Sequence, residues 1–198
     1  MPEFSRYRLE AAIADAAREA FLSAVADNPD HEFFAFALTT LSDVEYIECS
    51  LNSARNLEKI LSKANEANLR RHFPSDEAMR HYYKWYPNEW GDFEYYEQRG
   101  RNFFAPVQSL LMKIEECARV KNFDARRKYV FDSMISALQA LDGEGCFGGG
   151  ETRRERIVFA DVYDDEAAPE LRNRSIHEIN AGKTSPTMIE DFRGVRRA

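Results

Sequence analysis

The sequence predicts an α+β fold, formed as a single domain over residues 1–198. Two observations support this prediction. Segments with helical spacing of apolar residues alternate with short segments of strand type, and no repeat or long linker divides the chain. The length suits one domain, and 44% apolar residues are enough for a core. We expect an antiparallel or mixed sheet of about four strands, with helices mainly on one face.

Three segments carry the strand pattern. Residues 32–41 and 156–163 are apolar on both faces, which is typical of strands inside a sheet. Residues 45–52 alternate instead, with Ile47 and Leu51 facing one side. The turn between the first two segments is short, so this pair should be antiparallel.

The remaining regular segments have the apolar periodicity of helices. The first carries its apolar stripe from Leu9 to Ala24, and the second begins after the N-cap residue Ser53. Two more helices lie on either side of residues 122–124. Two helices follow the third strand, and Pro186 stands in the first turn of the last one.

Charge and cysteine content exclude several classes of protein. A net charge of −7 argues against nucleic-acid binding, because phosphate contacts require clustered Lys and Arg. The three cysteines fit neither a disulfide framework nor a zinc site, which indicates reduced thiols in the cytoplasm. The N-terminus lacks an apolar signal segment, and no run approaches the ~18 apolar residues of a membrane span. We expect a cytoplasmic protein with no membrane association.

No motif in the chain fixes a chemistry. Residues 143–148 read G-x-G-x-x-G, but a helix precedes them and a strand follows, which is the reverse of the order in a dinucleotide site. These glycines instead suit a helix stop and a sharp turn. The four histidines form no metal-binding pair. We therefore expect no catalytic residue, no metal and no cofactor.

The most distinctive segment is residues 82–96, with eight aromatic residues in fifteen positions and interleaved carboxylates. Tyr and Trp combine a large apolar body with a polar tip that needs a partner. Such a segment either anchors a loop on the sheet or forms a recognition surface. The predicted binding residues are Trp85, Tyr86, Glu89, Trp90, Tyr95 and Glu97.

Four motifs carry a resemblance to a known family. They are FFAFAL at 33–38, W-x-P-x-E-W at 85–90, G-x-F-G at 145–148 and R-S-x-x-x-I-N at 174–180. In this order they resemble a bacterial family catalogued only as a domain of unknown function. The resemblance spans residues 9–193 and implies no activity, cofactor or site residue. Acidic single-domain bacterial proteins of this kind are similar in type to the immunity proteins of toxin systems.

Three functional hypotheses follow. The first is a non-enzymatic, immunity-like protein that binds a basic protein partner through the surface from Trp85 to Glu97. The alternative is an enzyme or small-ligand binder with a carboxylate site near Asp161, at a strand end where acidic residues also suit the start of a helix. The third is a homodimer that uses the aromatic segment as its own interface. A concave pocket with converging carboxylates of perturbed pKa would favour the second hypothesis. Full burial of Trp85, Tyr86 and Trp90, with no other apolar patch, would count against the first.

Overall fold

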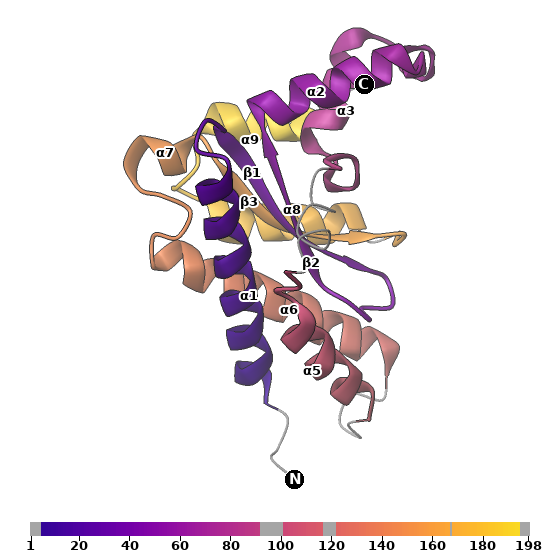
Figure 1. The fold of residues 1–198 in the computed structure, drawn as a ribbon. Helices are drawn as coiled ribbons and strands as arrows, with labels where there is room; N and C mark the ends of the chain where they lie inside the picture. The colour runs from indigo at the N-terminus through magenta and orange to yellow at the C-terminus, as the bar shows by residue number, and fades with distance from the viewer. Residues whose placement is uncertain (1–4, 92–100, 117–121, 167, 195–198) are drawn as a thin grey trace.

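The computed structural model describes residues 5–91, 101–116, 122–166 and 168–194 (Figure 1). The N-terminal part contains α1 (Arg6–Asp27), β1 (Phe33–Leu41), β2 (Glu48–Ser53), α2 (Ala54–Glu66), the 3-10 helix η1 (Leu69–His72), α3 (Asp76–Trp85) and the 3-10 helix η2 (Pro87–Glu89). The C-terminal part contains α5 (Ala105–Glu116), α6 (Phe123–Gly143), α7 (Gly150–Arg154), β3 (Ile157–Tyr163), α8 (Ala168–Asn180) and α9 (Pro186–Arg193). The predicted α+β class is confirmed.

The sheet is mixed, with the strand order β2-β1-β3. β1 pairs antiparallel with β2 and parallel with β3, so that Phe36 lies beside Leu51 on one side and Val158 on the other. All three segments predicted as strands form strands. The described residues contain these three strands only, so the prediction of about four is not confirmed.

Helices α1, α5 and α6 cover one face of the sheet (Figure 1). Their apolar stripes enclose Phe36, Leu38, Leu51, Val158 and Ala160, which point to this face and are buried. α1 contacts both α5 and α6. This cluster is the main hydrophobic core.

The opposite face of the sheet is also covered, contrary to the prediction of helices mainly on one face. Ala35, Ala37, Ile157 and Phe159 pack there in a second cluster, together with the following residues from the helices and from the segment after α3: Trp85, Trp90, Ile176 and Phe192. The physical reason was already visible in the sequence, because strands that are apolar on both faces need cover on both faces.

The outer edge of β3 is sealed by side chains of α8. Val158 donates its N–H to Asn180 Oδ1 (3.0 Å), and Asn180 Nδ2 donates to the Val158 carbonyl (2.6 Å). Ala160 donates its N–H to Ser175 Oγ (3.1 Å), which lies 2.9 Å from the Ala160 carbonyl. α8 thus satisfies strand groups that another strand would otherwise pair with. Ser175 and Asn180 are two of the three fixed polar residues of the R-S-x-x-x-I-N motif, the third being Arg174.

A smaller lobe of α2 and α3 carries the described part of the aromatic segment, residues 82–91. Ser53 and Ser75 cap these two helices, accepting from the N–H groups of Asn56 (3.1 Å) and Ala78 (3.0 Å). Asn56 Nδ2 also donates to the carbonyl of Trp90 (3.0 Å). The lobe therefore fixes the backbone after α3 against the end of β2.

The glycine-rich connector turns the chain from α6 into α7 and β3. Gly145 and Gly148 have φ values of 78° and 92°, a region that side chains rarely adopt. A Cβ on Gly148 would lie 3.1 Å from Thr152. Between them Phe147 is buried in the main core, so the predicted structural role of the glycines is confirmed.

Candidate functional site

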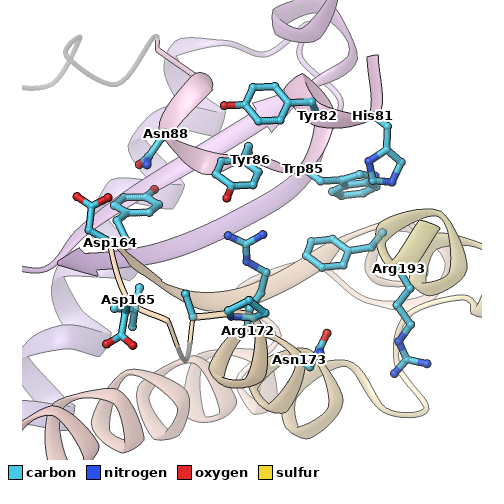
Figure 2. Close-up of a pocket in the computed structure, with 15 residues that line it drawn as sticks. His81, Tyr82, Trp85, Tyr86, Asn88, Asp164, Asp165, Arg172, Asn173 and Arg193 are labelled. Atoms are coloured by element: carbon cyan, nitrogen blue, oxygen red, sulfur yellow. The ribbon is translucent and has the colours of Figure 1, made fainter. Parts of the chain in front are cut away.

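A cleft of about 490 Å³ opens at the carboxyl end of β3, and we call it the β3 cleft (Figure 2). Its volume lies within the range of roughly 300–1,000 Å³ that is typical of ligand pockets. α3 and η2 form one side, and the start of α8 and the end of α9 form the other. Its lining residues include Tyr82, Trp85, Tyr86, Asp164, Arg172, Asn173, Phe192 and Arg193.

Tyr86 lies at the centre of the β3 cleft, between Tyr82 and the guanidinium of Arg172 (Figure 2). The rings of Tyr82 and Tyr86 are stacked, with centroids 4.9 Å apart and an interplanar angle of 21°. The guanidinium carbon of Arg172 is 4.9 Å from the centroid of Tyr86, a cation–π contact. Tyr82 donates its hydroxyl to Glu89 (2.9 Å), and burial together with this bond raises the pKa of Tyr82. Tyr86 is thus held in a fixed orientation while remaining half-exposed.

The floor of the cleft contains a buried ion pair. Arg172 donates from Nε to Asp161 Oδ1 (2.9 Å) and from Nη2 to the second carboxylate oxygen. Asp161 is fully buried, and burial raises its pKa against the opposing charge of Arg172. The Val162 N–H also donates to Asp161 (3.0 Å). Asp161 therefore lies near the cleft, as the alternative hypothesis expected, but Arg172 neutralises it.

The two ends of the β3 cleft carry opposite charges (Figure 2). Asp164, with a φ of 54°, is exposed at one end, beside Asp165, which forms an ion pair with Arg127. Arg193 is exposed at the other end. Arg193 forms no ion pair with another described residue.

Both tryptophans that were predicted to bind a partner are buried in the structure. Trp85 and Trp90 are only 1% and 0% exposed, and their rings pack on Phe192 (5.1 Å) and Phe159 (6.1 Å) respectively. A binding face made of exposed indoles therefore does not form: Trp85 lines the cleft, whereas Trp90 lies outside it, and both rings anchor their segment on the sheet. The small side chains Ala35 and Ala37 on this face of the sheet leave the space that the rings fill.

The other predicted binding residues lie in different parts of the structure or outside its described residues. Tyr86 lines the β3 cleft, and Glu89, which is half-buried, holds Tyr82. Tyr95 and Glu97 lie outside the described residues. Of the six predicted residues, Trp85 and Tyr86 therefore line the cleft directly.

Sequence reasoning missed Arg172, Asn173 and Arg193. Arg172 had a detectable signal, because Asp161 interrupts the apolar run of β3, and a buried carboxylate needs a cationic or hydrogen-bonding partner. The basic residues of the following helix were the nearest candidates. Arg193 and Asn173 had no such signal, since only the packing of α8 and α9 brings them to the cleft.

Neither described cysteine resembles a nucleophile. Cys49 is buried, and burial raises its pKa to about 12. Burial also raises the pKa of Cys146, in the glycine-rich connector. A nucleophilic cysteine needs the opposite shift. In the described parts of the chain, no group of three or more His, Cys, Asp or Glu side chains could hold a metal ion.

Comparison with known protein families identifies the family of this chain. The model of a family described as "Domain of unknown function (DUF4303)" matches residues 13–181. The chain belongs to this family. The match includes every described lining residue of the β3 cleft except Phe192 and Arg193, and it confirms the resemblance to an uncharacterised domain family. No curated protein and no solved structure matches the chain. Among the described helices, none is long and apolar enough to cross a membrane.

Proposed function

We propose that this domain is a non-enzymatic binding protein whose β3 cleft receives a segment of another protein. The observation that supports it is the placement of Tyr86, half-exposed at the centre of a concave site and held between Tyr82 and Arg172. Rigid aromatic side chains in preformed pockets are typical anchors of protein interfaces, because little conformational freedom is lost on binding.

The electrostatics of the cleft favour binding over catalysis. The buried Asp161 is neutralised by Arg172, and Asp165 by Arg127. General acid–base chemistry needs a titratable group that is within reach of a substrate and has a pKa matched to its task. Both of these carboxylates are instead held in ion pairs.

The charge of the whole chain favours a basic partner. A net charge of −7 attracts positively charged proteins over distances of about a Debye length, which increases the rate of encounter. In this proposal the domain acts in the bacterial cytoplasm and holds its partner as immunity proteins hold theirs. The cleft then selects the segment that docks.

A pull-down from a native bacterial host tests the proposal. The bait is the full chain, the Tyr86→Ala variant, and a matched control, Met112→Ala, which changes a 69% exposed residue of α5 on the other face of the sheet. We expect the original chain and Met112→Ala to capture the same protein and Tyr86→Ala to lose it, with all three equally folded by circular dichroism. Equal capture by Tyr86→Ala would contradict the proposal.

A second candidate function is a small-ligand binder in the same cleft. The observation that favours it is the concave shape next to Asp161, with the exposed carboxylate of Asp164 at one end. Native mass spectrometry of the protein purified from its host separates the two candidates. A bound small molecule of constant mass, lost in an Asp164→Asn variant, would favour this second function.

A further inference from the structure

We infer that the outward face of α1 binds the α1 of a second copy of this chain, so that two copies form a symmetric dimer with antiparallel helices. This surface belongs to the layer of α1, α5 and α6, on the side of the sheet away from the β3 cleft (Figure 1). The inference therefore goes beyond the proposed function, and such a dimer leaves both of its clefts open.

α1 exposes large apolar side chains on the side that faces away from the sheet. Its buried residues recur at helical spacing from Leu9 to Ala24 and pack in the main core. On the outward side Tyr7, Leu22 and Val25 are 77%, 51% and 39% exposed. They are three of the six exposed large hydrophobic residues in the described parts of the chain. Exposed apolar residues that gather on one helix face indicate a contact surface, whereas single scattered ones do not.

The outward face also has the spacing of a coiled-coil seam. Six residues that follow one another at alternating intervals of three and four form one stripe along the helix. None of the six is buried. They are Arg8, Ala11, Asp15, Arg18, Leu22 and Val25. We call this stripe the α1 seam.

A two-fold axis at the midpoint of the α1 seam makes the seam complementary to itself in size. Ala11 then lies opposite the partner's Leu22, so that a small side chain meets a large one. Val25 lies opposite the partner's Arg8, whose aliphatic stem covers it. Each contact occurs twice, because both copies use the same surface.

The charges of the α1 seam favour the antiparallel direction. In the antiparallel pair each Asp15 faces the partner's Arg18, and both contacts are attractive. In a parallel pair Asp15 would face the partner's Asp15 and Arg18 the partner's Arg18, and both contacts would be repulsive. Charge complementarity therefore selects a second copy of this chain, in one orientation, as the occupant of this face.

Arg18 is able to bind the partner without losing its present bonds. It donates from Nη1 to Asp15 of its own chain (2.9 Å) and from Nη2 to Glu144. Its Nε has no acceptor among the described residues, and the side chain of Asp15 is 71% exposed. Because a guanidinium carries five N–H donors, Nε remains to donate to the partner's Asp15. The charges around the axis then form a network, which stabilises more than an isolated surface pair does.

The size of the contact predicts a weak dimer. A helix of 22 residues is about 33 Å long and about 10 Å wide, so two such faces bury on the order of 700 Å² in total. Stable interfaces bury roughly 1,200–2,000 Å². We therefore expect an association that depends on protein concentration.

Sedimentation equilibrium of the full chain, from micromolar to near-millimolar concentration, tests the inference. We expect a monomer–dimer equilibrium whose dissociation constant rises about tenfold or more in Leu22→Gln, because each copy loses an apolar contact. The matched control is Leu69→Gln, the same change at an exposed leucine of η1, which should leave the constant unchanged. A monomer at every concentration, or a dimer that Leu22→Gln and Leu69→Gln affect equally, would overturn the inference.

Charge exchange tests the direction of the two helices. Asp15→Arg alone places like charges opposite each other and should weaken the dimer about tenfold or more. The double variant Asp15→Arg with Arg18→Asp restores opposite charges across an antiparallel pair but not across a parallel one. We expect it to dimerise more tightly than Asp15→Arg, with all variants equally folded by circular dichroism. A double variant that dimerises no better than Asp15→Arg would contradict the antiparallel arrangement.

Discussion

Arg172 shows how much depends on single residues in this molecule. One side chain compensates the buried Asp161 through two hydrogen bonds and also contacts the ring of Tyr86. The guanidinium suits this double role, because its planar fork matches a carboxylate while its face stacks on an aromatic ring. The ion pair below the cleft and the aromatic stack above it are therefore coupled through Arg172.

Replacing Arg172 should expose this coupling. In Arg172→Leu, Asp161 is left in the protein interior without its cation, and we expect a loss of about 3–5 kcal/mol in the free energy of unfolding. The double variant Arg172→Leu with Asp161→Asn should recover much of the loss, because no buried charge remains. Urea denaturation measures both. Equal stability of the single and the double variant would show that the unpaired charge of Asp161 is not what destabilises Arg172→Leu.

At the scale of elements, side chains of α8 take the place of a fourth strand beside β3. Its residues Ser175 and Asn180 bond the backbone of β3 where an additional strand would otherwise pair. Asn180 also accepts from Arg153 Nη2 (3.2 Å), which links the helix to α7. This arrangement explains why the sheet ends at β3 although β3 is buried on both faces.

The substitution Asn180→Ala should therefore lower the free energy of unfolding. It leaves the N–H and the carbonyl of Val158 buried without side-chain partners, and each such group costs about 1–3 kcal/mol. We expect a loss of about 2–5 kcal/mol in unfolding free energy, measured by denaturant titration, and faster hydrogen exchange of the Val158 amide. His177→Ala, an exposed position on the same helix, is the control. A similar stability for both variants would argue that the bonds from Asn180 to the edge of β3 do not stabilise the fold.

The sequence predicts elements better than it predicts their arrangement. The three strands and the cap at Ser53 follow from local patterns, because periodicity and N-cap chemistry act over a few residues. The burial of Trp85 and Trp90 does not follow, since it depends on small residues of β1 that lie far away in the chain. The β3 cleft is harder still, because five separate elements line it.

At the scale of the whole molecule, one polar network ties distant elements together. The buried Asp142 at the end of α6 accepts from Arg153 Nε in α7 (2.5 Å) and from Lys183 Nζ after α8 (2.8 Å). Arg153 Nη1 also donates to Thr184 Oγ1 (2.7 Å). The network joins the helices of one face of the sheet to the turn that leads into α9 and therefore to the cleft.

This network should make stability depend on pH. Burial alone would raise the pKa of Asp142, but the bonds from Arg153 and Lys183 outweigh it and hold the pKa below its ordinary value. Its contribution is therefore present above about pH 4 and lost as the pH falls through the lowered value. We expect Asp142→Asn to be less stable at pH 7 and the gap to narrow toward pH 2, as measured by urea denaturation. A gap that stays constant with pH would contradict this assignment.

The position of the two tryptophans has a practical consequence. Both indoles belong to the cluster on the cleft side of the sheet, and neither belongs to the core beneath α1, α5 and α6. Intrinsic fluorescence therefore reports the integrity of one layer, whereas circular dichroism reports the helices of both. If the two signals change at different denaturant concentrations, the layers melt in separate steps, and the order of the transitions identifies the weaker layer.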